Sequence, residues 1–105
     1  MLKNLVVGLS LISASASVMP AAQAAGDRAL GEYLSNTCVT CHRLDGTSQE
    51  GIPSITNWPN DQFVAVLQAY RSKVREHQIM NSLTSGLSDA DMEALAEYFG
   101  SLSRK

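Results

Sequence analysis

The two cysteines of this chain stand three positions apart, in the run Cys38-Val39-Thr40-Cys41-His42. Cys-x-x-Cys-His is the pattern by which c-type haem is attached to a polypeptide. We expect Cys38 and Cys41 each to form a thioether with one haem vinyl group. We expect His42 to bind the iron as the proximal ligand. A chain with this run has to fold around a large, flat, apolar group, and the pattern predicts one covalently bound haem c.

Three other interpretations of the cysteine pair remain open. A thioredoxin-like redox pair would need alternating strands and helices, and the sequence has no strand-like alternation. A structural zinc site would need four protein ligands, and only His77 remains to join Cys38, Cys41 and His42. A single disulfide of an exported protein would close a very tight loop and leave most of the chain unconstrained.

The beginning of the chain is typical of an export signal. Lys3 provides a positive charge, residues 5–12 are mainly apolar, and residues 22–24, Ala-Gln-Ala, form a small-x-small cleavage site. We therefore predict a Sec signal peptide over residues 1–24 and a mature domain over residues 25–105. The apolar run is shorter than the roughly 20 residues that cross a bilayer, so no membrane span is expected after cleavage. The alternative is a buried N-terminal helix.

The length and charge of the chain narrow the class of protein further. A chain of 105 residues holds one small domain, and a formal net charge of −2 gives no basic patch for nucleic acid. A single core in a domain this small rarely contributes more than about 3–5 kcal/mol, so such domains usually contain a covalent or metal staple. Export predicts a soluble protein of the periplasm, where a covalent haem would serve as that staple.

Helical spacing of apolar residues predicts an all-α domain of three to four short helices. The first spans residues 25–37 and is capped by Asp27; Gly31 within it suggests the close approach of another helix. The second runs from a cap at Asn60 to about residue 73, and the last begins after a cap at Ser88. The apolar faces comprise Leu30, Tyr33, Leu34 and Thr37 in the first helix, Phe63, Val66, Leu67 and Tyr70 in the second, and Met92, Leu95, Ala96, Phe99 and Leu102 in the last.

Two segments show no helical period. Residues 37–59 are rich in Gly, Pro, Ser and Asn, and unstructured loops longer than about 15 residues are uncommon unless a function organises them. Because this loop follows the Cys-x-x-Cys-His run, we expect it to wrap the haem. Residues 72–86 form a polar, aperiodic stretch that contains Met80.

Met80 is the expected second axial ligand of the iron. Met1 and Met19 would leave with the signal peptide, and Met92 lies on the apolar stripe of the last helix, where a core role is expected. Ligation by His77 or by Met92, or an open position, remains as an alternative. Methionine ligation raises the redox potential and suits electron transfer, whereas an open position permits ligand binding.

Other residues are candidates for contacts around the haem. Histidines that bind a metal usually donate their second ring N–H to an acceptor, and the carbonyl of Pro53 is the expected acceptor for His42. The haem propionates could take hydrogen bonds or positive charge from several side chains, each with an ordinary core or surface role as the alternative. These are Trp58, Tyr70, Arg71 and Arg75.

Over its mature length the sequence resembles the class I cytochromes c. The resemblance implies their fold around one haem, in which the first and last helices cross and a glycine meets an aromatic residue. It would thus pair Gly31 with Tyr98 or Phe99. The residues that carry it are Gly31 and Tyr33, the run 38–42, the turn 51–55, Met80, and residues 87–99.

A narrower resemblance is to the cytochrome subunit of flavocytochrome c sulfide dehydrogenase. It implies that the haem accepts electrons from a flavoprotein that oxidises sulfide, with no catalytic residue in this chain itself. A free periplasmic electron carrier for another dehydrogenase or oxidase is the alternative, and a haem sensor or small peroxidase is a third. The residues that carry the narrower resemblance are 62–64, 67–72, Arg75, 79–80 and 86–89.

Overall fold

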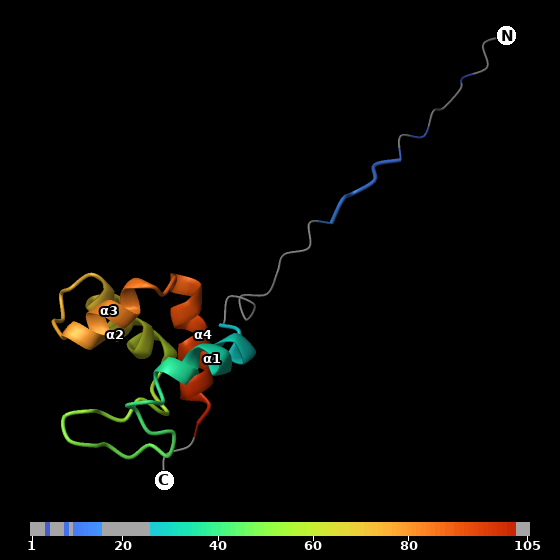
Figure 1. Cartoon of the computed structure of the whole chain (residues 1–105). Helices are drawn as coiled ribbons and strands as arrows, with labels where there is room; N and C mark the ends of the chain where they lie inside the picture. The colour runs from blue at the N-terminus through green and yellow to red at the C-terminus, as the bar shows by residue number, and fades with distance from the viewer. Residues whose placement is uncertain (1–3, 5–7, 9, 16–25, 103–105) are drawn as a thin grey trace.

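The computed structural model describes residues 4, 8, 10–15 and 26–102. Most of the predicted signal peptide therefore lies outside the described residues. Within them the regular structure is helical without β-strands, as the all-α prediction requires, and no helix is long and apolar enough to cross a membrane. The helices, seen in Figure 1, are α1 (Arg28–Leu34), the 3-10 turn η2 (Ser35–Thr37), α2 (Asn60–Arg71), α3 (Gln78–Ser85) and α4 (Asp89–Gly100).

The first and last helices cross in direct contact, and α1 lies against α4 in Figure 1. A Cβ atom added to Gly31 would lie 2.0 Å from the backbone oxygen of Ala94 and 2.8 Å from the Cβ of Tyr98. No side chain fits such a gap, so glycine is required where the two backbones meet. This confirms the packing that Gly31 and Tyr98 were expected to share.

The hydrophobic core lies between α4 and α2. Phe99 is fully buried and stacks on Phe63 of α2, with ring centroids 5.7 Å apart. Of the predicted apolar face of the last helix, Met92, Leu95 and Ala96 are buried as well, whereas Leu102 lies beyond the end of α4 and is half-buried. Among the described residues, the remaining buried apolar side chains are Val64, Leu67 and Ala94.

Two of the predicted apolar faces need correction. In α2 the buried face includes Val64, while Val66 and Tyr70 are only half-buried. In α1 the aromatic ring of Tyr33 is 73% exposed. Periodicity identifies the stripe of a helix only to within about one residue, and the neighbouring helix decides which side of the stripe is covered.

Helix ends follow the expected capping chemistry in two of three cases. The Asp27 carboxylate accepts from the backbone N–H of Leu30, and Ser88 and Asp91 form a reciprocal capping box at the start of α4. The predicted cap at Asn60 is wrong. Asn60 is the first helical residue of α2, and its amide donates to the Glu97 carboxylate at 2.7 Å, a partner far along the sequence.

The polar stretch before the last helix is partly helical, which corrects its description as an aperiodic loop. Helix α3 is capped by the His77 ring, whose Nδ1 accepts from the backbone N–H of Met80 at 3.4 Å. Thr84 is fully buried near its other end. The apolar residues of α3, Ile79, Met80 and Leu83, lie at helical spacing, but the helix has only eight residues, too few for the sequence pattern to reveal it.

Candidate haem site

The Cys-x-x-Cys-His run begins directly after the 3-10 turn η2, which follows α1. The backbone N–H of Cys38 donates to the carbonyl of Ser35 at 2.8 Å, and that of His42 donates to the carbonyl of Cys38 at 2.9 Å. Cys41 likewise donates to the carbonyl of Cys38 at 3.2 Å. Residues three positions apart on a helical turn are neighbours, so this backbone brings the two thiols to one side.

Both thiols are free in the structure. Cys41 is exposed and Cys38 is half-buried. Burial raises the pKa of the Cys38 thiol, against a smaller opposing effect of its hydrogen bond with Thr37. No group of three or more His, Cys, Asp or Glu side chains suited to a metal ion exists within the described part of the chain.

The ring of His42 is held by the turn that follows the run. Its Nδ1 lies 2.8 Å from the carbonyl oxygen of Pro53. Because a carbonyl only accepts, Nδ1 carries the proton, and the lone pair of the ring is on Nε2. Two free thiols on one turn and an imidazole with Nε2 available are the donors that a covalent haem requires. The residues present therefore fit this group.

The turn that presents Pro53 has its own local supports. Gln49 and Ile52 exchange two backbone hydrogen bonds, of 2.7 and 3.1 Å. Gly51 between them adopts φ +72°, a left-handed conformation that a side chain would strain. The backbone N–H of Asn57, farther along, donates to the carbonyl of Phe99 at 2.9 Å and anchors the loop on α4.

Met80 lies in the first turn of α3 and packs, partly buried, against the hydrophobic core. Its backbone N–H donates to His77, and its carbonyl accepts from the Thr84 hydroxyl at 2.7 Å. His77 uses Nδ1 as a helix cap, which is a structural role. Met92 is fully buried in the core, as expected for a packing residue.

The side chains considered for the propionates fall into two groups. Arg75 lies over the ring of Tyr70, with 5.4 Å from its guanidinium carbon to the ring centroid, so these two form one cation–π pair. Trp58 packs edge-on against Phe63 in the core, with ring centroids 6.5 Å apart.

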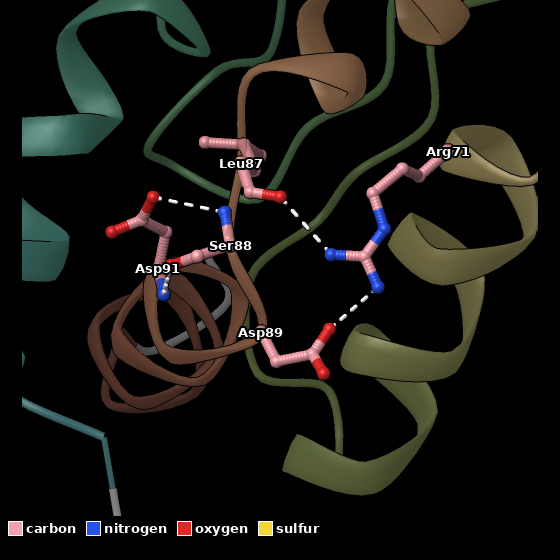
Figure 2. A network of polar contacts seen from close by, with 5 residues as sticks. All are labelled: Arg71, Leu87, Ser88, Asp89 and Asp91. Atoms are coloured by element: carbon pink, nitrogen blue, oxygen red, sulfur yellow. Dashed lines mark hydrogen bonds and ion pairs between the residues drawn. The ribbon is translucent and has the colours of Figure 1, made fainter.

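Arg71 is engaged elsewhere, in the polar network of Figure 2. Its guanidinium donates to the backbone carbonyl of Leu87 at 3.0 Å and to the Asp89 carboxylate at 2.5 Å. The hydrogen bond from Arg71 and its positive charge lower the pKa of the Asp89 carboxyl. The charge of Arg71 is thus used to tie the end of α2 to the start of α4.

Two residues close to Met80 were not singled out from the sequence. Asn81 makes three side-chain hydrogen bonds, and the hydroxyl of Thr84 donates to the carbonyls of Met80 and Asn81. Their only sequence signal is polarity within a segment that was not expected to be helical.

Comparison with known proteins identifies the family. A family model described as cytochrome c matches residues 28–103. The chain belongs to the cytochrome c family. Its cofactor is therefore haem c, and it is an electron-transfer haem protein of the class I, all-α type.

Three curated relatives support the assignment. The cytochrome subunit of sulfide dehydrogenase from Chlorobaculum tepidum is 35% identical over 75 residues, covering 71% of this cytochrome and 68% of that protein. Cytochrome c-554(548) from Halomonas halodenitrificans is 36% identical over 81 residues, covering 73% of this chain and 98% of that one. Cytochrome c-553 from Nitratidesulfovibrio vulgaris is 29% identical over 106 residues, covering 96% and 100% of the two chains.

Proposed function

We propose that this cytochrome c is the haem subunit that accepts electrons from a sulfide-oxidising flavoprotein and passes them to another redox protein. The observation that carries the proposal is the 35% identity to the cytochrome subunit of sulfide dehydrogenase. The chain would act as an electron carrier, and the chemistry on sulfide would belong to the partner.

The haem would be held by four side chains of this chain. The thiols of Cys38 and Cys41 would each add S–H across one vinyl group, giving two thioethers with no atom lost. His42 would bind the iron through Nε2 and Met80 through its sulfur. When bound, haem c supplies a one-electron change at its iron.

The surrounding residues would keep that ligand set unchanged between the two oxidation states. The Pro53 carbonyl lies 2.8 Å from Nδ1 of His42, so it fixes the ring orientation and the tautomer. The backbone of Met80 is bonded at both its N–H and its carbonyl. Tyr70 and Arg75 would contribute a polar and a positive group for contact with the haem. A site that does not rearrange transfers electrons with little reorganisation.

Export belongs to the same proposal. Residues 1–24 would be removed as a Sec signal peptide, and residues 25–105 would act in the periplasm as a monohaem cytochrome c domain. The sequence of that segment, with Lys3, its apolar run and the Ala22-Gln23-Ala24 site, supports this.

A free electron carrier is the second candidate. Cytochrome c-554(548) is matched over 98% of its length at 36% identity, so this chain also resembles a relative not named as a subunit. Both candidates share the haem site, and they differ in whether a flavoprotein is bound.

Purification from the native host separates the two candidates. We expect the tagged cytochrome to retain a second protein and to show the absorption of haem and of flavin together. Adding sulfide to this preparation should reduce the haem. A haem protein that elutes alone, and that stays oxidised when sulfide and the host flavoprotein fraction are added, would contradict the proposal and favour the free carrier.

A further inference from the structure

The segment that leads into Met80 has little to hold it. Residues 72–79 are all exposed, so no buried side chain anchors the connection between α2 and α3. Within it Lys73 adopts φ +64°, a left-handed conformation that costs an L-residue about 1 kcal/mol. Such a turn persists only when surrounding contacts determine it.

Backbone hydrogen bonds fix only the first part of this turn. Ser72, Lys73 and Arg75 donate to carbonyls in the last turn of α2, at 2.9 to 3.1 Å. These bonds end α2, and none of them reaches α3.

One side chain joins the three parts of the connection. The amide nitrogen of Asn81 donates to the carbonyl of Tyr70 at the end of α2, and to that of Arg75 in the turn, each at 2.8 Å. Its amide oxygen accepts from the backbone N–H of His77, the cap of α3, at 2.9 Å. Asn81 thus ties the end of α2, the turn and the start of α3 together.

This tie is adjacent to the expected iron ligand. Asn81 follows Met80 directly, and the buried Thr84 hydroxyl donates to the carbonyls of both residues, at 2.7 and 3.3 Å. Any shift of α3 relative to α2 would therefore move the Met80 backbone.

We propose that Asn81 is a positioning residue that keeps Met80 on the haem iron. The proposal rests on the ligation by Met80 set out above. Asn81 does not need to touch the haem, because it acts through the backbone of its neighbour. Loss of its two donated bonds would leave the Arg75 carbonyl to water and the Tyr70 carbonyl with only its backbone partner Lys73, and would allow α3 to move away from α2.

Ligand exchange on the ferric holoprotein tests this. Imidazole is added, and the loss of the near-infrared band of methionine bound to ferric haem is followed in time. For Asn81→Ala we expect displacement about tenfold faster than in the wild type, the factor for a lost net hydrogen-bond contribution of ordinary size. Circular dichroism of each variant reports whether the helices remain.

Asn81→Asp separates positioning from helix stability. Aspartate keeps the oxygen that accepts from His77, but it replaces the amide donor with an oxygen facing two carbonyls. We expect exchange at least as fast as in Asn81→Ala. A carboxylate in the first turns of α3 favours the helix itself, so a role limited to helix stability would leave the rate unchanged or lower it.

Ser85→Ala is the matched control. It removes a 2.6 Å side-chain hydrogen bond to Ser82 inside the same helix, and its rate should stay within about twofold of the wild type. The role of Asn81 alone would be overturned if both Asn81 variants exchanged their ligand at the rate of Ser85→Ala. This conclusion requires that the band is present in the wild type and absent in Met80→Ala. A wild type without the band, or a Met80→Ala variant that keeps it, would overturn the Met80 ligation as well.

Discussion

Cys38, Cys41 and His42 occupy one continuous turn, and the backbone bonds of that turn determine which side chains can reach a common group. The next partner, Pro53, comes from a separate turn and fixes the His42 ring through its carbonyl. At this scale the residues of the run have distinct expected roles, with two covalent anchors and one iron ligand. Each role can be tested by one substitution.

Cys41→Ser should leave the haem attached through Cys38 alone. One vinyl group would then stay unsaturated, and its conjugation with the ring shifts the absorption of the reduced pyridine complex to longer wavelength. The measurement is the spectrum of that complex, with mass spectrometry of the intact chain to show that haem is still bound. An unshifted spectrum would mean that Cys41 forms no thioether. Ser35→Ala, which changes a side chain bonded to the Glu32 carbonyl, is the control with two thioethers.

The site residues differ in how well the sequence predicts them. The contact between His42 and Pro53 follows from a general rule about metal-bound histidines and from a proline turn at a suitable distance along the chain. The surroundings of Met80 do not follow, because Asn81 and Thr84 bond to backbone atoms whose position depends on the packing of α3. The Pro53 carbonyl could be expected because a proline marks its turn, whereas nothing in the sequence marks the carbonyls that Asn81 and Thr84 contact.

At the scale of elements, the crossing of α1 and α4 depends on Gly31. Gly31→Ala should destabilise the fold by about 3 kcal/mol or more, because the new methyl group would overlap the backbone of Ala94. For a domain of this size this lowers Tm by more than about 10 °C. Thermal unfolding of the holoprotein, followed by circular dichroism, measures the change.

Gly86→Ala is the matched substitution for Gly31→Ala. Gly86 has φ −91°, and the nearest atom to an added Cβ is the Leu83 carbonyl oxygen at 3.8 Å. It should leave Tm unchanged or raise it by a few degrees. Equal effects of the two substitutions would show that the helix crossing does not require glycine.

The pair formed by Arg71 and Asp89 should make stability depend on pH. The hydrogen bond and charge of Arg71 lower the pKa of Asp89 in the folded state, so folding favours the ionised carboxylate. The stabilisation is complete above the ordinary carboxyl pKa and is lost as the pH falls through the lowered value. Wild type should exceed Asp89→Asn in Tm at neutral pH, and the difference should vanish in acid.

Salt and a second acid provide the controls for this pair. The Asp89 side chain is 71% exposed, so the difference in Tm between wild type and Asp89→Asn should be small and should shrink at high ionic strength. Asp61→Asn, which changes an acid in the first turn of α2 outside this pair, is the matched substitution. A difference between wild type and Asp89→Asn that stays constant across the acid range would rule out the ion pair as its cause.

The sequence predicts helix ends well where residues close in the chain determine them, and less well where contacts with distant residues do. Asp27 and Ser88 cap their helices through residues three positions away, and both were predicted correctly. Asn60 has the composition of a cap, yet Glu97 in another helix takes its amide. Helix α3 was missed because it has only eight residues, so its apolar residues Ile79, Met80 and Leu83 cover little more than one turn. Its cap and its side-chain hydrogen bonds come from His77 and Thr84, polar residues that do not predict a helix.

The part of the molecule that the structure describes has a small protein core. Apart from alanines, its buried apolar side chains are Phe63, Val64, Leu67, Met92, Leu95 and Phe99, all on α2 and α4. Several large apolar side chains elsewhere are exposed in the polypeptide alone, among them Leu44, Ile79 and Leu83. A domain of this size usually needs a further source of stability, and covalent haem c is the group that the family carries.

Removing both thioethers should therefore unfold most of the protein. We expect the double variant Cys38→Ala, Cys41→Ala to retain no haem and to lose cooperative thermal unfolding, since the core of α2 and α4 alone is too small. Circular dichroism over a temperature range is the measurement, with Cys41→Ser as the single-thioether comparison. A haem-free double variant that unfolds cooperatively near the wild-type Tm would show that the polypeptide folds stably without haem.

The account depends most on an iron held between His42 and Met80, because this ligand pair distinguishes an electron carrier from a haem sensor or a peroxidase. The most direct measurement is the near-infrared absorption of the ferric holoprotein in the wild type, Met80→Ala and Met92→Leu. Met92 is fully buried in the core, and leucine replaces it at nearly equal volume.

We predict that the methionine band is present in the wild type and in Met92→Leu. We predict that Met80→Ala lacks the band and has a lower redox potential. A wild type without the band that binds carbon monoxide tightly, or a Met80→Ala variant with the band and potential unchanged, would contradict the account.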